Sequence, residues 1–166
     1  MKPILENPAI KKCGQNLKYD MLILRRYGIE VRGLYFDTMV AAFLLQPDNR
    51  KFNLGNLSKQ YLYYEMQPIE ELIGKGKNQK SMADVPLEDI TFYACEDADV
   101  AYQLTGILKD KLTKNSLDDV YFDIEIPLIP VLMDMEQNGV YVEISYLQEM
   151  SAEISKKIDV IAEKIH

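Results

Sequence analysis

Apolar residues recur along most of the chain at the three- and four-residue spacing typical of helices that bury one face. This spacing predicts helices over residues 17–27, 37–46, 54–64 and 86–114. Asn16, Asp37 and Asn53 precede the first three helices and are expected to cap them, because short polar side chains accept from free N–H groups there. Pro86 suits the first turn of the fourth helix, and Gly28 suits the end of the first.

The remaining segments have weaker patterns. Residues 31–36 alternate enough to predict a short strand, and residues 65–85 are expected to be irregular. Residues 118–138 have helical spacing interrupted by Pro127 and Pro130, which predicts a kink or two abutting helices. A final amphipathic helix is expected from Ser145, its cap, to the C-terminus. The composition changes near residue 115, where we place the main domain boundary.

The bulk composition indicates an ordinary globular protein. The 166 residues are 48% hydrophobic and 27% charged, enough for about one domain with a core. No apolar run approaches the roughly 20 residues that span a bilayer, and no signal-peptide core follows the N-terminus, so no membrane partner is expected. Cys13 and Cys95 stand alone without a CxxC motif, which favours two buried thiols in a reduced, cytoplasmic setting.

Histidine content and charge restrict the chemistry. The only histidine is His166, so Ser-His-Asp catalysis, Cys-His catalysis and histidine-rich metal sites are excluded. The formal net charge of −7 argues against a globally basic nucleic-acid binder. An acidic chain can still be a nuclease, because a site that collects Mg²⁺ or Mn²⁺ through carboxylates is itself acidic.

Three acids interrupt the apolar stretch FYACEDADVAYQL, residues 92–104. At about 100° per residue, Asp97 falls in the middle of the apolar face and one turn after Tyr93. Glu96 and Asp99 fall on the edge of that face and beyond it, where solvated charges are expected. An unpaired carboxylate in an apolar face costs several kcal/mol, so Asp97 requires a buried salt bridge, N–H donors or a bound cation.

Asp20 repeats this arrangement in the helix over residues 17–27. It falls inside the apolar arc, although an acid in a first turn also has a structural explanation in the helix dipole. Two such aspartates with a nearby tyrosine suit two-metal phosphodiester chemistry. That chemistry needs about four carboxylates, and the pattern supplies two.

Two short blocks give these residues a family context. GQNLKYD (14–20) and YACED (93–97) resemble the second and third motifs of DEDDy-type 3′–5′ exonucleases. The blocks GQNLKYDMLILRRYGIEVRGLYFDTMVAAFLLQP, GKGKNQ and FYACEDADVAYQL follow in the order seen in the proofreading domain of bacterial family A DNA polymerases. IEIPLIPVLMDMEQNGVYV resembles the join between that domain and the polymerase domain. The resemblance therefore covers essentially the whole chain.

The resemblance implies a ribonuclease H-like α/β fold, truncated and helix-rich, over residues 1–114. Residues 115–166 would be the first helices of the polymerase domain of the same parent chain. Asp20 and Asp97 would bind Mg²⁺ or Mn²⁺, and Tyr93 would orient the attacking water. The single-stranded 3′ end of DNA would contact residues of the second motif and of the GKGK-like loop: Gln15, Asn16, Tyr19, Lys75 and Lys77. Composition alone also allows GKGKNQK to be a solvated loop.

The chain departs from the family at the first motif, an Asp-x-Glu on an N-terminal strand. Asp123 and Glu125 match the string but lie in a helical pattern, where residues two apart face about 200° apart. The expectation is therefore a proofreading region that serves DNA replication and repair, with the isolated fragment inactive because the motif is missing. The alternatives are a catalytically silent domain that braces the polymerase and a stand-alone DEDDy ribonuclease.

Overall fold

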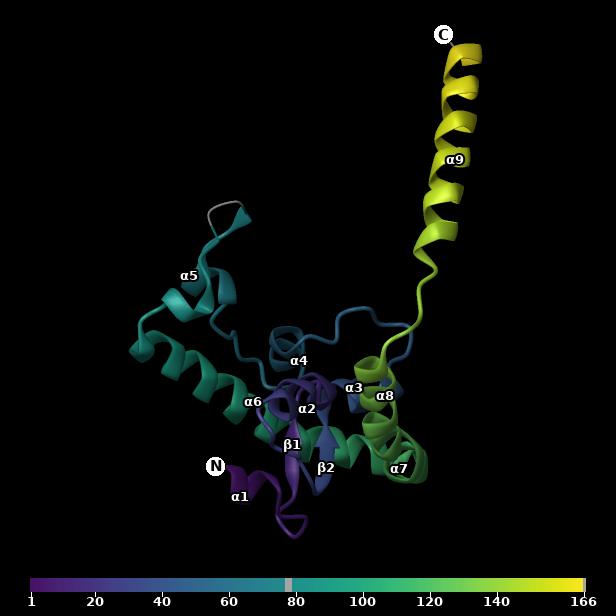
Figure 1. Ribbon diagram of the computed structural model, residues 1–166. Coiled ribbons are helices and arrows are strands. Elements are labelled where there is room, and N and C mark those ends of the chain that lie inside the picture. The colour runs from purple at the N-terminus through teal and green to yellow at the C-terminus, as the bar shows by residue number, and fades with distance from the viewer. Residues whose placement is uncertain (77–78, 166) are drawn as a thin grey trace. The chain divides into compact units, whose positions relative to one another are not determined.

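The computed structural model describes residues 1–76 and 79–165 (Figure 1). The chain forms two compact units, residues 1–135 and residues 136–166, and each is described by itself. The domain boundary expected near residue 115 stays a prediction. None of the helices in the described part of the chain has the length and apolar character that crossing a membrane requires.

A parallel two-stranded sheet lies at the centre of the first unit. Strand β1 spans Lys12–Gly14 and strand β2 spans Leu34–Asp37, and helix α2, Leu17–Arg26, connects them. Strand β2 confirms the predicted strand, displaced by a few residues. Strand β1 was not predicted because three residues are too few to show an alternating pattern, and its pairing partner lies more than 20 residues away.

The other elements of the first unit are mostly helical, so the fold is a helix-rich α/β fold as expected. The long helix α6, Leu87–Lys114, confirms the prediction, with Pro86 at its N-cap position. Helix α5, Ile69–Ile73, lies in the segment expected to be irregular. The further elements are α1 (Lys2–Leu5), α3 (Thr38–Leu45), α4 (Leu54–Tyr61), η2 (Met82–Asp84), α7 (Asp118–Val120), η3 (Tyr121–Glu125) and α8 (Ile126–Asn138).

The segment over residues 118–138 is helical as predicted, but its irregular turn lies before the two prolines and not at them. Residues Tyr121–Glu125 form a π-helical turn, and Pro127 and Pro130 lie in the α-helix that follows. Proline has no N–H to donate to the carbonyl oxygen four residues earlier in a helix. A wider turn just before Pro127 is compatible with this missing donor. The helical geometry of residues 123–125 confirms that Asp123 and Glu125 do not form a strand motif.

The second unit contains helix α9, Ile144–Ile165. The predicted cap at Ser145 is wrong. Ser145 lies inside the first turn, and its hydroxyl donates to the Glu143 carboxylate. Several apolar side chains of α9 are exposed within its own unit.

The core of the first unit is built on one face of α6. Val100, Leu104, Leu108 and Leu112 follow each other at helical spacing and are buried. Helices α3 and α4 and strand β1 all pack against α6 (Figure 1). The core also contains side chains from α2, β2, α4 and the segment after α6: Met21, Phe36, Leu57, Tyr121, Ile126, Ile129 and Met133. Residues 121–133 therefore share one hydrophobic core with the sheet.

Asp37 joins two helix N-termini to the end of the sheet. Its carboxylate accepts from the N–H groups of Met39 and Val40 in α3, at 2.9 and 3.2 Å, as the predicted cap should. It also accepts from the N–H groups of Asn16 and Leu17 at the start of α2, at 3.2 and 2.7 Å. The predicted cap by Asn16 is wrong, because Asn16 has a left-handed backbone and Asp37 takes its place.

The two cysteines differ from the expectation of two buried thiols. Both are free, but Cys13 is half-buried in β1 and Cys95 is exposed on α6. The buried residues of α6 begin at Val100, so Cys95 lies on a part of the helix outside the hydrophobic core. Predicting burial from residue type alone therefore failed for Cys95.

Candidate functional site

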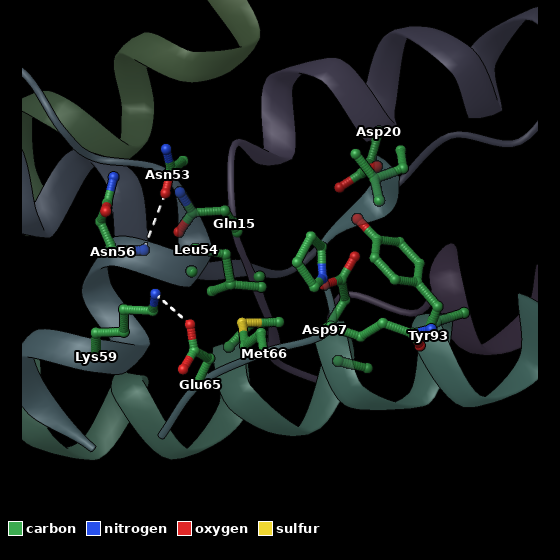
Figure 2. Close-up of a pocket in the computed structure, with 18 of the residues that line it drawn as sticks. Gln15, Asp20, Asn53, Leu54, Asn56, Lys59, Glu65, Met66, Tyr93 and Asp97 are labelled. Atoms are coloured by element: carbon green, nitrogen blue, oxygen red, sulfur yellow. Dashed lines mark hydrogen bonds and ion pairs between the residues drawn. The ribbon is translucent and has the colours of Figure 1, made fainter. Parts of the chain in front are cut away.

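Asp20, Tyr93 and Asp97 line one pocket of about 840 Å³ in the first unit. Asp20 comes from α2, and Tyr93 and Asp97 come from α6. Figure 2 shows the three side chains converging, with the Tyr93 hydroxyl directed toward Asp20. The structure therefore brings together the residues predicted from the two separate motifs.

The local structure of α6 explains how Tyr93 and Asp97 reach the pocket. They are four residues apart, so they lie on the same side of the helix, and the Tyr93 hydroxyl is near enough to the Asp97 carboxylate for each group to shift the pKa of the other. Ala94 and Ala98 line the same pocket with minimal side chains. This part of the apolar face consequently opens onto a cavity, and Asp97 is half-buried beside it instead of being enclosed in the core.

Both aspartates have raised pKa values. Burial raises the pKa of Asp20, and the charge of Asp37 adds to this effect. Burial also raises the pKa of Asp97, followed by repulsion from Glu96, while the nearby Tyr93 hydroxyl opposes the rise. A raised pKa means that the ionised carboxylate is disfavoured at this position, and a divalent cation would offset that cost.

Tyr93 is held in its protonated form by the same surroundings. Burial raises its pKa, and the nearby charge of Asp97 raises it further. A phenol with a raised pKa stays neutral at physiological pH and acts as a hydrogen-bond donor. Tyr93 is thus suited to orient a polar ligand and unsuited to act as a general base.

Gln15 also lines the pocket, and its amide is already engaged in the fold. Its Nε2 donates to the Phe52 carbonyl oxygen at 2.7 Å. The Thr38 hydroxyl donates to the Gln15 Oε1 and to the Gly14 carbonyl oxygen. These bonds fix Gln15 at the end of β1, so its position in the pocket is set by the sheet.

The other predicted substrate residues do not line the pocket. Asn16 and Tyr19 lie on α2 or just before it, and Tyr19 is 61% exposed on the surface. Lys75 is exposed beyond the end of α5 and outside the pocket lining. Lys77 lies outside the described residues. Contact between these four residues and a substrate stays a prediction.

Glu96 is not the solvated rim charge that its helical position predicted. Its carboxylate accepts from the Tyr64 hydroxyl at 2.7 Å and from the Gln67 backbone N–H at 2.9 Å. Glu96 therefore anchors the segment that leads into α5 against α6. Asp99 does fit the expectation, since it is exposed and its nearest polar partner is Gln103 of the same helix.

Sequence reasoning missed the opposite end of the pocket. The residues that line it there come from α4 and the segment that follows: Asn53, Asn56, Lys59, Glu65, Met66 and Gln67. Lys59 forms an ion pair with Glu65 at 2.6 Å, and Figure 2 shows this pair on the far side of the pocket from Asp20. Of these residues, only Asn53 was singled out by the sequence pattern, and the pattern predicted it as the cap of α4 and not as part of a pocket.

The donor set suits a hard divalent cation but is incomplete. Carboxylate oxygens are the ligands that Mg²⁺ and Mn²⁺ prefer, and Asp20 and Asp97 supply them without histidine or thiolate competition. Within residues 1–76 and 79–165, no three His, Cys, Asp or Glu side chains are gathered closely enough to hold a metal ion. Asp20 and Asp97 could hold such an ion only with water, substrate or further carboxylates completing its coordination.

Comparison with known proteins identifies the family. Residues 1–113 match the family model of the 3′–5′ exonuclease domain of A-type DNA polymerases. The chain belongs to this exonuclease family. DNA polymerase I of Chloroflexus aurantiacus is 38% identical over the whole chain, and that of Rhizobium leguminosarum is 37% identical over 94% of it. The chain spans only 18% and 15% of these two polymerases, respectively.

Solved structures support the exonuclease fold. A structure described as the POL domain of Pol1 from M. smegmatis, in complex with DNA primer-template and dNTP, matches 96% of this chain and 24% of its own. Its TM-score is 0.76 at 24% identity. Brucella melitensis NrnC matches 82% of this chain and 63% of its own, with a TM-score of 0.69 at 15% identity. At these identities, both likenesses concern the fold alone.

Proposed function

We propose that this chain is the proofreading region of a DNA polymerase of the DNA polymerase I type, acting in DNA replication and repair. The parent enzyme would remove 3′-terminal nucleotides from DNA by metal-dependent hydrolysis. The observation that carries the proposal is the convergence of Asp20, Tyr93 and Asp97 in one pocket of an exonuclease-family chain. In this proposal the parent works in the cytoplasm, and residues 115–166 begin its polymerase domain.

Asp20 and Asp97 would hold Mg²⁺ or Mn²⁺ in a two-metal site that other carboxylates complete. The bound ions supply an activated water and stabilise the charge on the leaving 3′ oxygen. Tyr93, kept neutral by its raised pKa and lying close to Asp97, would orient the attacking water. Its role would be positional, because a neutral phenol does not take up the proton of that water.

The substrate would be a single-stranded 3′ end of DNA. Gln15 would contact it within the pocket, and Asn16, Tyr19, Lys75 and Lys77 would contact it along the path outside. Proofreading must accept any base, so stacking and backbone contacts would dominate over base-specific hydrogen bonds. The acids in the pocket lining, including Asp20, Glu70 and Asp97, would repel phosphate unless metal ions offset their charge.

One observation favours a second candidate, a catalytically silent domain that braces the polymerase. Within residues 1–76 and 79–165, no three His, Cys, Asp or Glu side chains are gathered as potential metal ligands, so Asp20 and Asp97 alone do not complete a metal site. A stand-alone ribonuclease is less well supported, because the polymerase relatives match the segment beyond residue 113 as well.

Mn²⁺-dependent digestion of a 3′-labelled single-stranded oligonucleotide tests the proposal. We expect little or no trimming by this chain, and robust trimming by a longer chain that adds an upstream Asp-x-Glu segment. Asp97→Ala should abolish trimming by the longer chain, and Asp99→Ala, a matched change two residues away, should leave it unchanged. Absence of trimming by the longer chain would favour the silent domain. Robust trimming by the present chain that Asp97→Ala removes would refute its expected inactivity.

A further inference from the structure

One buried carboxylate near the site has no role in the proposed chemistry. Asp37 is 1% exposed and lies at the C-terminal end of β2. Its two oxygens accept four backbone N–H groups, two from the start of α2 and two from the first turn of α3. With its oxygens engaged in this way, Asp37 is unsuited to ligate a metal. Its effect on the site must come through the elements that it holds.

The element that Asp37 holds most directly is the helix that carries Asp20. The shortest of its four bonds, 2.7 Å, is to the N–H of Leu17, the first residue of α2. Asp20 lies in the same first turn, three residues further on. A shift or rotation of this turn would therefore move Asp20 relative to Tyr93 and Asp97, which α6 carries independently.

Asp37 is itself held from the other side by Tyr121. The Tyr121 hydroxyl accepts from the Asp37 backbone N–H at 2.6 Å and donates to the Asp37 carbonyl oxygen at 3.0 Å. Tyr121 is fully buried and packs its ring against Phe36, with 4.8 Å between the ring centroids. Tyr121 lies beyond residues 1–113, the part that matches the exonuclease family.

We propose that Asp37 is a positioning residue that sets the orientation of Asp20 toward Asp97 and Tyr93, and that Tyr121 keeps Asp37 in place. This inference rests on the proposed role of Asp20 in binding a divalent cation. It adds that a residue outside the matched exonuclease segment controls the geometry of the site. Substitutions of either residue should weaken metal binding without removing any metal ligand.

Tyr121→Phe is the sharper of two test variants. It deletes both hydrogen bonds to Asp37 and leaves every charge near the site unchanged, so a change at Asp20 reports position. Asp37→Asn also replaces one acceptor oxygen with a donor, and it has the larger expected effect. Leu108→Val and Leu108→Ala serve as controls, because Leu108 is buried in the core about three turns of α6 beyond Asp97. Each variant is compared with the control closest to it in free energy of unfolding.

The first readout needs no metal. We expect Tyr121→Phe to shift the ¹³C resonance of the Asp20 carboxyl carbon, whereas the matched Leu108 variant leaves it in place. The second readout is the Mn²⁺ dissociation constant, which should rise about tenfold or more, as is typical when a group that orients a ligand is removed. The matched control should change it by less than about twofold.

Equal effects of Tyr121→Phe and its control in both readouts would overturn the positioning role. An unmoved Asp20 resonance would overturn it even if metal binding weakened. Failure of the proposed function has a different signature. In that case the Asp97→Ala variant would bind Mn²⁺ as tightly as the unaltered chain. The metal-free resonance still decides the positioning question in that case. If Asp37→Asn fails to fold, Tyr121→Phe alone gives the result.

Discussion

Asp37 and Asp97 are both aspartates withdrawn from bulk water, and their surroundings differ in one respect. Asp37 is almost fully buried, and four backbone N–H groups of its own fold engage its carboxylate. Asp97 is half-buried at the wall of a pocket, where it meets the Tyr93 hydroxyl and the repelling charge of Glu96. Burial alone does not distinguish a carboxylate satisfied by the fold from one available to a ligand. The distinction lies in whether the fold itself satisfies the oxygens.

Asp20 belongs with Asp97 in this comparison. It also lines the pocket, and burial and the charge of Asp37 both raise its pKa. The two regions are linked through α2, because the carboxylate that caps this helix holds the turn that carries Asp20. Stability and the geometry of the pocket should therefore respond to different substitutions, with Asp37 affecting both.

The largest effect should come from shortening the chain. A version ending at residue 114 would lose Tyr121 and the buried side chains of Ile126, Ile129 and Met133. Losing this much core exceeds the cost of any single substitution, so we expect no cooperative unfolding transition. A version ending at residue 138 should show a cooperative unfolding transition in urea denaturation followed by circular dichroism. Equal stability of the two versions would show that the core of the first unit does not need the segment after α6.

Asp37→Ala should have the next largest effect, with a loss of about 2–4 kcal/mol in the free energy of unfolding. Each helix cap contributes about 1–2 kcal/mol, and this residue caps two helices. Asp99→Ala is the matched control, with an expected change within about 0.5 kcal/mol because Asp99 is exposed. A loss no greater than that of the control would contradict the structural role assigned to Asp37.

A smaller effect concerns pH and the pocket carboxylates. The pKa values of Asp20 and Asp97 are raised above 3.8, so the folded chain binds these protons more tightly than the unfolded chain does. Their contribution to stability is full below the unfolded pKa and is lost as the pH rises through the folded pKa values. In urea denaturation between pH 4 and pH 7, Asp97→Asn should therefore lose less stability with rising pH than the unaltered chain. Identical pH profiles would show that Asp97 is not disfavoured as an anion.

Local spacing was sufficient to predict much of the fold and the centre of the site. The long helix α6, the cap at Asn53 and the pairing of Tyr93 with Asp97 all depend on residues a few positions apart. The short strand β1 could not be predicted, since it is defined by pairing with β2. The cap of α2 was misassigned for the same reason, because its acceptor is 20 residues away in sequence.

Long-range contacts also explain why the surroundings of Glu96 and the far end of the pocket were not predicted. Glu96 lay at the edge of the helical face, and nothing in the local pattern indicated that Tyr64 and Gln67 would bind it. The far end of the pocket, with Lys59 and Glu65, depends on how α4 packs against α6. Position on a helix predicts which way a side chain points and does not predict what another segment brings to it.

The central claim is that Asp20 and Asp97 form an acidic pair available to a divalent cation. The most direct measurement is an Mn²⁺ titration of the chain, followed by paramagnetic broadening of side-chain NMR signals. We expect selective broadening of Asp20, Tyr93 and Asp97, at least about tenfold weaker binding in Asp20→Ala and Asp97→Ala, and unchanged binding in Asp99→Ala. Broadening spread over the surface acids, with the same affinity in all three variants, would contradict the claim.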